Sequence, residues 1–196
     1  MGREPAKSYH HGDLREALVK AGRAILEEEG LAGLTLRACA RKAGVSHAAP
    51  QHHYAGVAAL LADIAASGFE DFTRALDAAA ERVFAPMESH LAMCRAYLSF
   101  AAACPALYRL MFDGSPGVVL SQRLQAAMGS AWVQLTESIA DIAGPDPDNA
   151  KAIHVWSLLH GLAMLRNARR LPPLVDHDQA RERLVMDIKR LLGGGG

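Results

Sequence analysis

Apolar residues recur every three or four positions along nearly the whole chain. Leu14, Leu18 and Ile25 show this spacing near the start, and residues 57–83 repeat it over a longer stretch. A period of about 3.6 residues is typical of helices that bury one face. The sequence lacks the sustained period-two alternation of β-branched residues that marks strands. The pattern therefore predicts an all-α protein.

Residues that cap or break helices divide this pattern into separate elements. Gly30 is expected to end a first helix, while Thr35 and Gly44 bound a second. Ser46 should cap a short third helix that stops near residue 54, and a long fourth helix then runs to Pro86. Beyond this break, the expected helices span 88–104, 106–112, 118–143, 149–167 and 178–192.

Composition and charge narrow the class of protein. With 196 residues, of which 51% are hydrophobic, the chain can bury a core without disulfides. The three cysteines lie far apart in apolar surroundings, which suggests reduced core residues in a cytoplasmic protein. The sequence has no signal-peptide core and no run of about 18 apolar residues, so we expect no membrane partner. The formal net charge is zero, so binding to nucleic acid would depend on where the charges lie.

The stretch AGVSHAAPQHHY, residues 43–54, has the features of a helix-turn-helix. The second and third expected helices are joined only by Gly44 and Val45. Glycine readily takes the positive φ that such a turn needs, and the small Ala40 lets the two helices approach closely. The third helix is too short and too polar to build a core. In a helix-turn-helix, this second helix is the one presented to the major groove of DNA.

Three motifs at these spacings resemble the DNA-binding domain of the TetR family of bacterial transcriptional regulators. They are YHHGDLR, EEEGLAGLTLRACARKAGVS and the His-His-aromatic end of the third helix, all within residues 9–64. The stretches PALYRLMF and VWSLLHGLAML resemble the C-terminal domain of one branch, which carries a Trp-His-Gly signature. Here the signature residues are Trp156, His160 and Gly161.

The resemblance implies two domains. The first is a helix-turn-helix DNA-binding domain over residues 11–71, with the motif itself at 35–54. The second is a regulatory, ligand-binding and dimerisation domain over residues 86–192. Two positions depart from the usual family pattern: Gln51 stands where an aromatic residue is common, and Val57 stands where a lysine often contacts phosphate.

The residues expected to face DNA lie on the second and third helices and carry hydroxyl, ring N–H, amide or guanidinium donors. For phosphate contacts we expect Thr35, Ser46, His53 and Tyr54. For base edges we expect Arg37, His47, Ala48, Gln51 and His52. Most of the nine histidines lie in residues 1–54, where Lys and Arg also outnumber Asp and Glu, so binding should be sensitive to salt.

Aromatic, methionine and histidine residues gather in the second part of the chain. The candidates for lining a small-molecule cavity are Tyr97, Phe100, Tyr108, Met111, Phe112, Trp132, Trp156, His160 and Met164. An apolar effector would suit such a wall, because methionine adapts to varied shapes and tryptophan stacks. A plain helical core would use the same residues, and both interpretations remain open.

The helix expected over 149–167 is apolar on two sides. Ile153, Trp156, His160 and Met164 share one face at about 100° per residue, and a second face holds Val155, Leu158, Leu162 and Leu165. A helix buried on both sides needs a partner, and a second copy of the chain is the simplest one. Leu184 and Ile188 of the last helix would complete a four-helix interface. The resulting homodimer would place two recognition helices on a palindrome.

These features favour a ligand-responsive transcriptional regulator, and specifically a repressor that a small apolar effector releases from a palindromic operator. We expect no enzymatic activity and no cofactor, because nucleophile elbows and phosphate-binding glycine loops are absent from the sequence. We also expect no metal site, since the adjacent His52 and His53 would point about 100° apart on a helix. Two alternatives stay open: a family member with weakened DNA binding, and a helical small-molecule-binding protein or enzyme that reuses the fold.

Overall fold

Helices make up all the regular secondary structure in the part of the chain that the structure describes. The computed structural model describes residues 11–112 and 119–193. Its elements are α1 (His11–Glu29), η1 (Leu31–Gly33), α2 (Leu36–Ala43), η2 (Ala49–His52), α3 (Val57–Ala80), α4 (Pro86–Ala103), α5 (Pro105–Phe112), α6 (Gln122–Ala143), α7 (Ala150–Asn167) and α8 (His177–Leu192), where η marks a 3₁₀ helix. The prediction of an all-α protein is confirmed.

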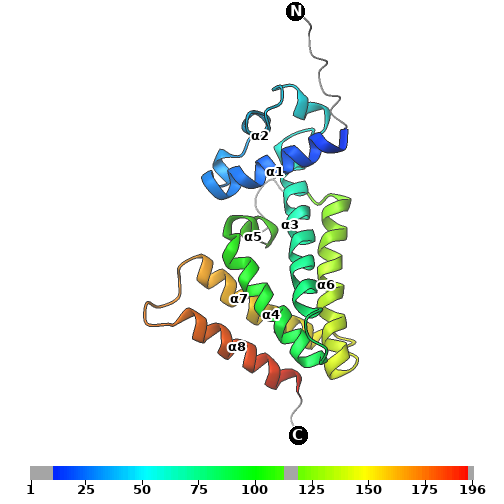
Figure 1. Ribbon diagram of the computed structural model, residues 1–196, viewed down its shortest axis with the longest axis vertical. Helices are drawn as coiled ribbons and strands as arrows, with labels where there is room; N and C mark the ends of the chain where they lie inside the picture. The colour runs from blue at the N-terminus through cyan, green and yellow to red at the C-terminus, as the bar shows by residue number, and fades with distance from the viewer. Residues whose placement is uncertain (1–10, 113–118, 194–196) are drawn as a thin grey trace, which may run out of the picture.

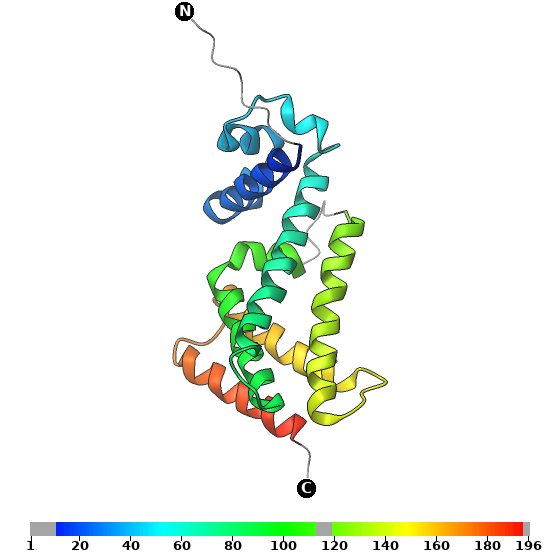
Figure 2. The same cartoon turned by 45° about the vertical axis from the view of Figure 1, so that its right-hand side comes forward.

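The helices form two groups joined by α3. The N-terminal part comprises α1 to η2, and the C-terminal part comprises α4 to α8. Figure 1 shows α1 and α2 at one end of the molecule, with α3 running from them down into the other group. In Figure 2, α3 and α6 again lie side by side along most of their length. The two groups therefore share one long helix as their common wall.

Local signals explain the ends of α1 and α2. Gly30 follows α1 with a φ of 73°, and Gly44 follows α2 in the left-handed region with a φ of 70°. Such a conformation suits glycine because it has no side chain to clash. The Thr35 hydroxyl oxygen accepts a hydrogen bond from the Ala38 N–H at 3.0 Å, so the expected N-cap of α2 is confirmed.

The expected third helix is wrong as an α-helix. Residues 46–54 instead form a turn followed by the short 3₁₀ helix η2. Pro50 explains the change: it has no N–H to give to the Ser46 carbonyl, and that carbonyl accepts from Ala49 at 3.1 Å instead. Proline also disfavours the α conformation in the residue before it. The segment therefore tightens into a 3₁₀ turn around the buried proline ring.

The long helix α3 packs against both parts of the molecule. Leu60 and Ile64 are fully buried beneath the N-terminal part, and Phe69 and Phe72 are buried in the C-terminal part. The helix α5 packs tightly against Gly68, because a Cβ atom there would lie 2.7 Å from the Met111 sulfur. This residue lets α5 dock directly on α3.

The C-terminal part begins with two helices at a sharp angle. Proline at the first position of α4 is favourable because no N–H is needed there, so this helix starts two residues earlier than expected. The helices α4 and α5 are bent by 108° at their junction, where Pro105 starts the second. Ser121 caps α6 through the Leu124 N–H, and residue 118, where this helix was expected to start, lies outside the described residues. No single helix in the described ranges is long and apolar enough to cross a membrane, although α4 and α5 together pass by length and composition.

Candidate DNA-binding surface and ligand cavity

Most residues predicted to face DNA are exposed at the start of α2 and around η2. The exposed side chains are Thr35, Arg37, Ser46, His47, Ala48, Gln51 and His52, and His53 is half-buried. The left-handed Gly44 turns the chain between the two elements, and the Val45 N–H donates to the Ala40 carbonyl at 3.0 Å, which fixes the corner. The geometry thus presents one polar surface formed by α2 and η2. Contact of these residues with DNA stays a prediction.

Tyr54 is the exception, and the prediction of a phosphate contact there is wrong. Its side chain is 3% exposed, and its hydroxyl donates to the Asp63 carboxylate on α3 at 2.8 Å. Its backbone N–H donates to the Pro50 carbonyl. Both donors are therefore used inside the protein. Tyr54 anchors the end of η2 to α3, so it acts on the surface only by positioning it.

Asp63 is the centre of a buried polar cluster that sequence reasoning missed. The Arg15 guanidinium on α1 donates to its two oxygens at 2.5 and 2.9 Å, and Arg123 on α6 lies 3.8 Å from one of them. Burial alone would raise the pKa of Asp63, but the hydrogen bonds from Arg15 and Tyr54 outweigh it and hold that pKa below its usual value. A lone aspartate within the apolar run LLADIAA was the available signal.

Two further polar contacts join helices across the molecule: one links α1 to α5, and the other links α6 to α3. Glu27, near the end of α1, accepts hydrogen bonds from the Leu107 N–H at 2.9 Å and the Ala106 N–H at 3.4 Å. Its carboxylate thereby caps the N-terminus of α5, where negative charge is favourable. Arg123 pairs with Glu70 through two hydrogen bonds of 2.8 and 2.9 Å and joins α6 to α3.

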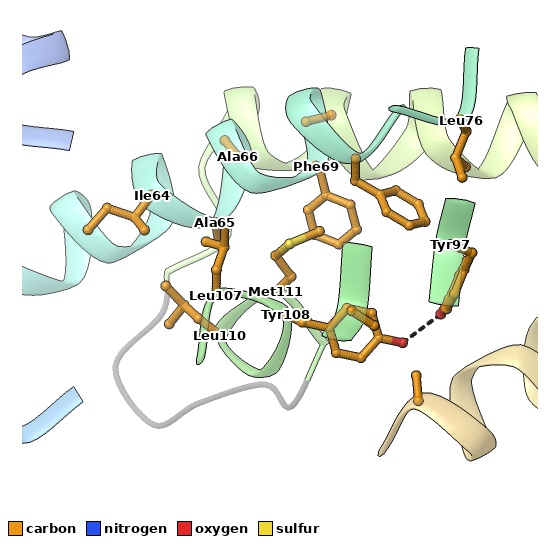
Figure 3. Packing of buried hydrophobic residues seen from close by; sticks show 14 of the residues in the cluster. Ile64, Ala65, Ala66, Phe69, Leu76, Tyr97, Leu107, Tyr108, Leu110 and Met111 are labelled. Atoms are coloured by element: carbon orange, nitrogen blue, oxygen red, sulfur yellow. Dashed lines mark hydrogen bonds between the residues drawn. The ribbon is translucent and has the colours of Figure 1, made fainter. Parts of the chain in front are cut away.

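A cavity of about 560 Å³ lies among α3 to α7. The residues at its wall are Phe69, Phe72, Leu76, His90, Met93, Cys94, Tyr97, Met111, Phe112, Met128, Gly129, Ala131, Trp132, Leu135, Trp156, Leu159 and His160. This volume and apolar character are typical of small-molecule sites. Figure 3 shows part of its surroundings, with Met111 reaching from α5 towards Phe69 on α3.

Six of the nine predicted cavity residues lie at this wall: Tyr97, Met111, Phe112, Trp132, Trp156 and His160. The other three do not. Tyr108 is fully buried behind it, Phe100 packs edge-on against Phe72 with ring centroids 5.3 Å apart, and Met164 packs against the core. Sequence reasoning also missed the wall residues of α3, because that helix looked like a connector. Their apolar stripe continues far past the N-terminal part, and this length was the signal.

The polar groups of the wall are few and uncharged. No Asp, Glu, Lys or Arg lies among the wall residues. The Tyr97 hydroxyl is 2.7 Å from the Tyr108 hydroxyl, which is 2.8 Å from Nδ1 of His160 (Figure 3 draws the first contact). Burial raises the pKa of Tyr97 and of Cys94 to about 12, and lowers the pKa of His90 to about 4. All three side chains are thus neutral near pH 7.

The expected dimer face needs correction at two positions. Val155 on α7 and Ile188 on α8 are 0% exposed, because both point into the core of their own chain. The buried face of α7 is formed by Ala152, Val155, Leu159 and Ala163. Val155 therefore faces the core, whereas Leu158 of the same predicted stripe lies outside this face. Leu158 is 41% and Leu165 is 47% exposed. Leu162 and Leu184 are half-buried.

The expected lack of a metal site stays a prediction. In the described ranges, no group of three His, Cys, Asp or Glu side chains comes close enough to hold an ion.

Comparisons with protein families and with solved structures find proteins similar to this chain. Residues 90–188 match a family model described as the tetracyclin repressor-like C-terminal domain. Among solved structures, a protein of unknown function from Rhodococcus sp. RHA1 is 30% identical, with a TM-score of 0.82 over 96% of this chain and 100% of its own. No curated protein matches the sequence.

Two regulators share the fold at lower identity. A TetR-family regulator from Streptomyces coelicolor A3 is 23% identical, with a TM-score of 0.58 over 99% of this chain and 100% of its own. A regulatory protein of the TetR family from Rhodococcus RHA1 is 20% identical, with a TM-score of 0.67 over 93% and 98%. Assignment to the branch with the Trp-His-Gly signature stays a prediction. With the matched model covering half of the chain and the fold shared along its length, this protein belongs to the TetR family of transcriptional regulators.

Proposed function

We propose that this protein is a DNA-binding repressor that works in the cytoplasm as a homodimer and leaves its operator when a small apolar molecule enters the cavity. One observation carries the proposal: the same helix, α3, anchors the exposed α2–η2 surface at one end and walls the apolar cavity at the other. We expect no turnover of the bound molecule and no cofactor.

The proposed contacts with DNA divide into two kinds. Thr35 and Ser46 would donate their hydroxyl hydrogens to phosphate, together with the ring of His53. Arg37, His47, Ala48, Gln51 and His52 would face the base edges. Gln51 suits adenine, with which an amide pairs through two hydrogen bonds, and Arg37 suits guanine. Because η2 has only four residues, one subunit should read few bases.

The proposed dimer uses the outward side of α7 and α8. Leu158 and Leu165 are exposed there, with Leu162 and Leu184 at the edge. Gly161 lies between them on α7, with open space where a side chain would stand. A small residue in an apolar stripe permits close approach of a second helix. The two-fold related subunits would then read a palindrome.

The proposed coupling runs from the cavity to the DNA-binding surface through two contacts. A guest in the cavity touches Met111 and Phe112 of α5, whose N-terminus is held by Glu27 of α1. It also touches the cavity half of α3. A guest that binds one arrangement of these helices better than the other would shift the population towards it and lower the affinity for operator DNA.

The alternative function, a family member with weak DNA binding, is favoured by two residues. Val57 is 40% exposed at the first turn of α3, where a cationic residue would reach phosphate. Gln51 is exposed where an aromatic residue would add contact area. On this alternative, the cavity alone would carry the function.

The deciding experiment is selection of randomised duplex DNA on the purified protein at near-physiological salt, read by sequencing. The proposal expects an enriched palindrome whose half-sites lie about one helical turn apart. Arg37→Ala should reduce the enrichment, whereas Arg82→Ala, which removes the same charge from an exposed position just after α3, should not. Weak retention with no enriched sequence, equal in both variants, would favour the alternative.

A further inference from the structure

His90 is the one polar wall residue with a buried atom that lacks a partner. Among the described residues, three buried side-chain atoms have no hydrogen bond: Thr73 Oγ1, His90 Nε2 and Gln134 Oε1. Only the ring of His90 belongs to the wall of the cavity. The residue is 1% exposed. A buried polar atom left without a partner costs free energy, so a bound molecule that supplies one gains affinity.

The hydrogen-bond network determines what that partner must be. The Ser138 hydroxyl donates its single hydrogen to the Leu135 carbonyl at 2.8 Å. In its 2.9 Å contact with Nδ1 of His90, the serine oxygen must therefore accept. Nδ1 then carries the hydrogen. Because burial keeps the ring neutral at physiological pH, Nε2 is a bare acceptor.

The other residues of the cavity wall determine the charge and polarity that a bound molecule should have. No charged side chain lies there, and an ion would lose its hydration without gaining a counter-charge. The tyrosine hydroxyls already pair with each other and with His160. Flexible methionines and the T-shaped pair of Trp132 and Trp156, with ring centroids 6.1 Å apart, favour an apolar body.

We propose that the cavity takes an uncharged, mainly apolar molecule that donates one hydrogen bond, from an alcohol or phenol hydroxyl, to Nε2 of His90. This inference rests on the proposed function only in treating the cavity as the effector site. Ser138 is a positioning residue: it fixes the tautomer and thereby selects a donor over an acceptor.

The test compares probes of matched size: 1-decanol, which donates and accepts, with 2-decanone and methyl nonyl ether, which only accept. Both tryptophans of the chain line the cavity, so their fluorescence reports binding without a label. The decanol should bind at least about 10-fold more tightly than the ketone, since one hydrogen bond to a buried group is at stake. His90→Phe should bring this ratio close to one. Ser138→Ala should lower the ratio of decanol to decanone affinity. Without the serine oxygen, the His90 ring could carry its hydrogen on Nε2 and donate it to the ketone, which would then bind more tightly.

Nitrogen NMR of the histidines in the unaltered protein provides a test that needs no variant to fold. It should show Nε2 of His90 without a hydrogen, with a shift that changes when decanol binds. A hydrogen on Nε2, or equal affinity for decanol and decanone, would overturn the inference and leave the proposed function standing. If no probe alters the tryptophan emission, the cavity is not a binding site and both fail. If decanol is preferred as expected but does not release operator DNA, only the proposed coupling fails.

Discussion

The N-terminal and C-terminal parts of this molecule differ in how tightly their cores are packed. Around the start of α3, Leu18, Cys39, Leu60 and Ile64 are all 0% exposed, and the buried Asp63 is held by an arginine and a tyrosine. At the other end of α3, aromatic and methionine side chains surround about 560 Å³ of space. Tight packing with an ion pair specifies one arrangement, whereas a hollow lined by flexible side chains permits several. The surface proposed for DNA is thus held firmly, and the part proposed for the ligand has room to change.

The largest expected effect comes from breaking the ion pair of Arg15 and Asp63 beneath the candidate DNA-binding surface. Arg15→Ala leaves the Asp63 carboxylate, 1% exposed, with only Tyr54 and the more distant Arg123. Loss of one partner of a buried charge should lower the free energy of unfolding by about 3 kcal/mol. Urea titration near pH 7 measures it. Arg74→Ala, which breaks an exposed pair with Asp71 on the same helix, should cost less than about 1 kcal/mol. Equal losses would mean that burial adds nothing to the Asp63 pair.

Acid should weaken the two parts in sequence. The pKa of His90 is lowered to about 4 by burial, so the unfolded chain takes up a proton first as pH falls below about 6.5. The free energy of unfolding is therefore not reduced by His90 above about pH 6.5. It falls by about 3 kcal/mol as the pH is lowered from there to about 4. The pKa of Asp63 is held below its usual value, so its contribution is present above about pH 4 and disappears only below that.

Urea titrations at several pH values between about 7 and about 2 measure this order. His90→Phe should flatten the dependence of unfolding free energy on pH between about 7 and 4, while leaving the loss below about pH 4 unchanged. An unchanged slope in the variant would assign the acid sensitivity to groups outside the cavity.

The same glycine substitution should have different effects in the two parts. A Cβ atom on Gly22 would lie 2.5 Å from Cδ1 of Ile64, which is fully buried beneath α1. A Cβ atom on Gly68 would lie 2.7 Å from the sulfur of Met111, which borders the cavity and has space to move into. Gly22→Ala should therefore destabilise the protein by about 1–2 kcal/mol, because overpacking costs more than the roughly 1 kcal/mol that alanine gains in a helix.

Gly68→Ala should be close to neutral in urea unfolding, since the helix gains about 1 kcal/mol from alanine and Met111 yields. It should also weaken the binding of 1-decanol, because the displaced methionine occupies the cavity. Tryptophan fluorescence checks this directly. If Gly68→Ala lowers the free energy of unfolding as much as Gly22→Ala, Met111 cannot move into the cavity. The two parts would then be packed equally tightly, against our expectation.

Sequence reasoning succeeded where one local cause acts alone. Thr35 and Gly44 bound α2 as expected, because a cap and a left-handed turn depend only on neighbouring residues. It failed where causes compete. Pro50 lies just past the first turn, where a missing N–H is no longer harmless, and its lack of a hydrogen bond to Ser46 sufficed to turn the segment into a 3₁₀ helix.

Tertiary partners were the other limit. Periodicity indicated two apolar faces on α7 but not which of them faces the chain's own core, so Val155 was assigned outward. Arg15 and Asp63 are 48 residues apart, and nothing in the sequence alone pairs them. The aromatic residues of the cavity wall were found from composition, whereas His90 was missed because its importance depends on a hydrogen bond to Ser138 on another helix.

The smallest expected effect concerns the link between the two parts. Glu27→Ala removes the carboxylate that accepts from the N–H groups at the start of α5 and should lower the free energy of unfolding by about 1 kcal/mol, as loss of a cap does. Glu29→Ala is the matched control, because it removes the same charge from an exposed position in the last turn of α1 that, among the described residues, makes no hydrogen bond to α5. If α5 carries the ligand's effect, decanol should release operator DNA from the Glu27 variant less completely than from the control at equal occupancy of the cavity. Equal release would mean that α3 alone is sufficient to couple the cavity to the N-terminal part, without the Glu27 contact to α5.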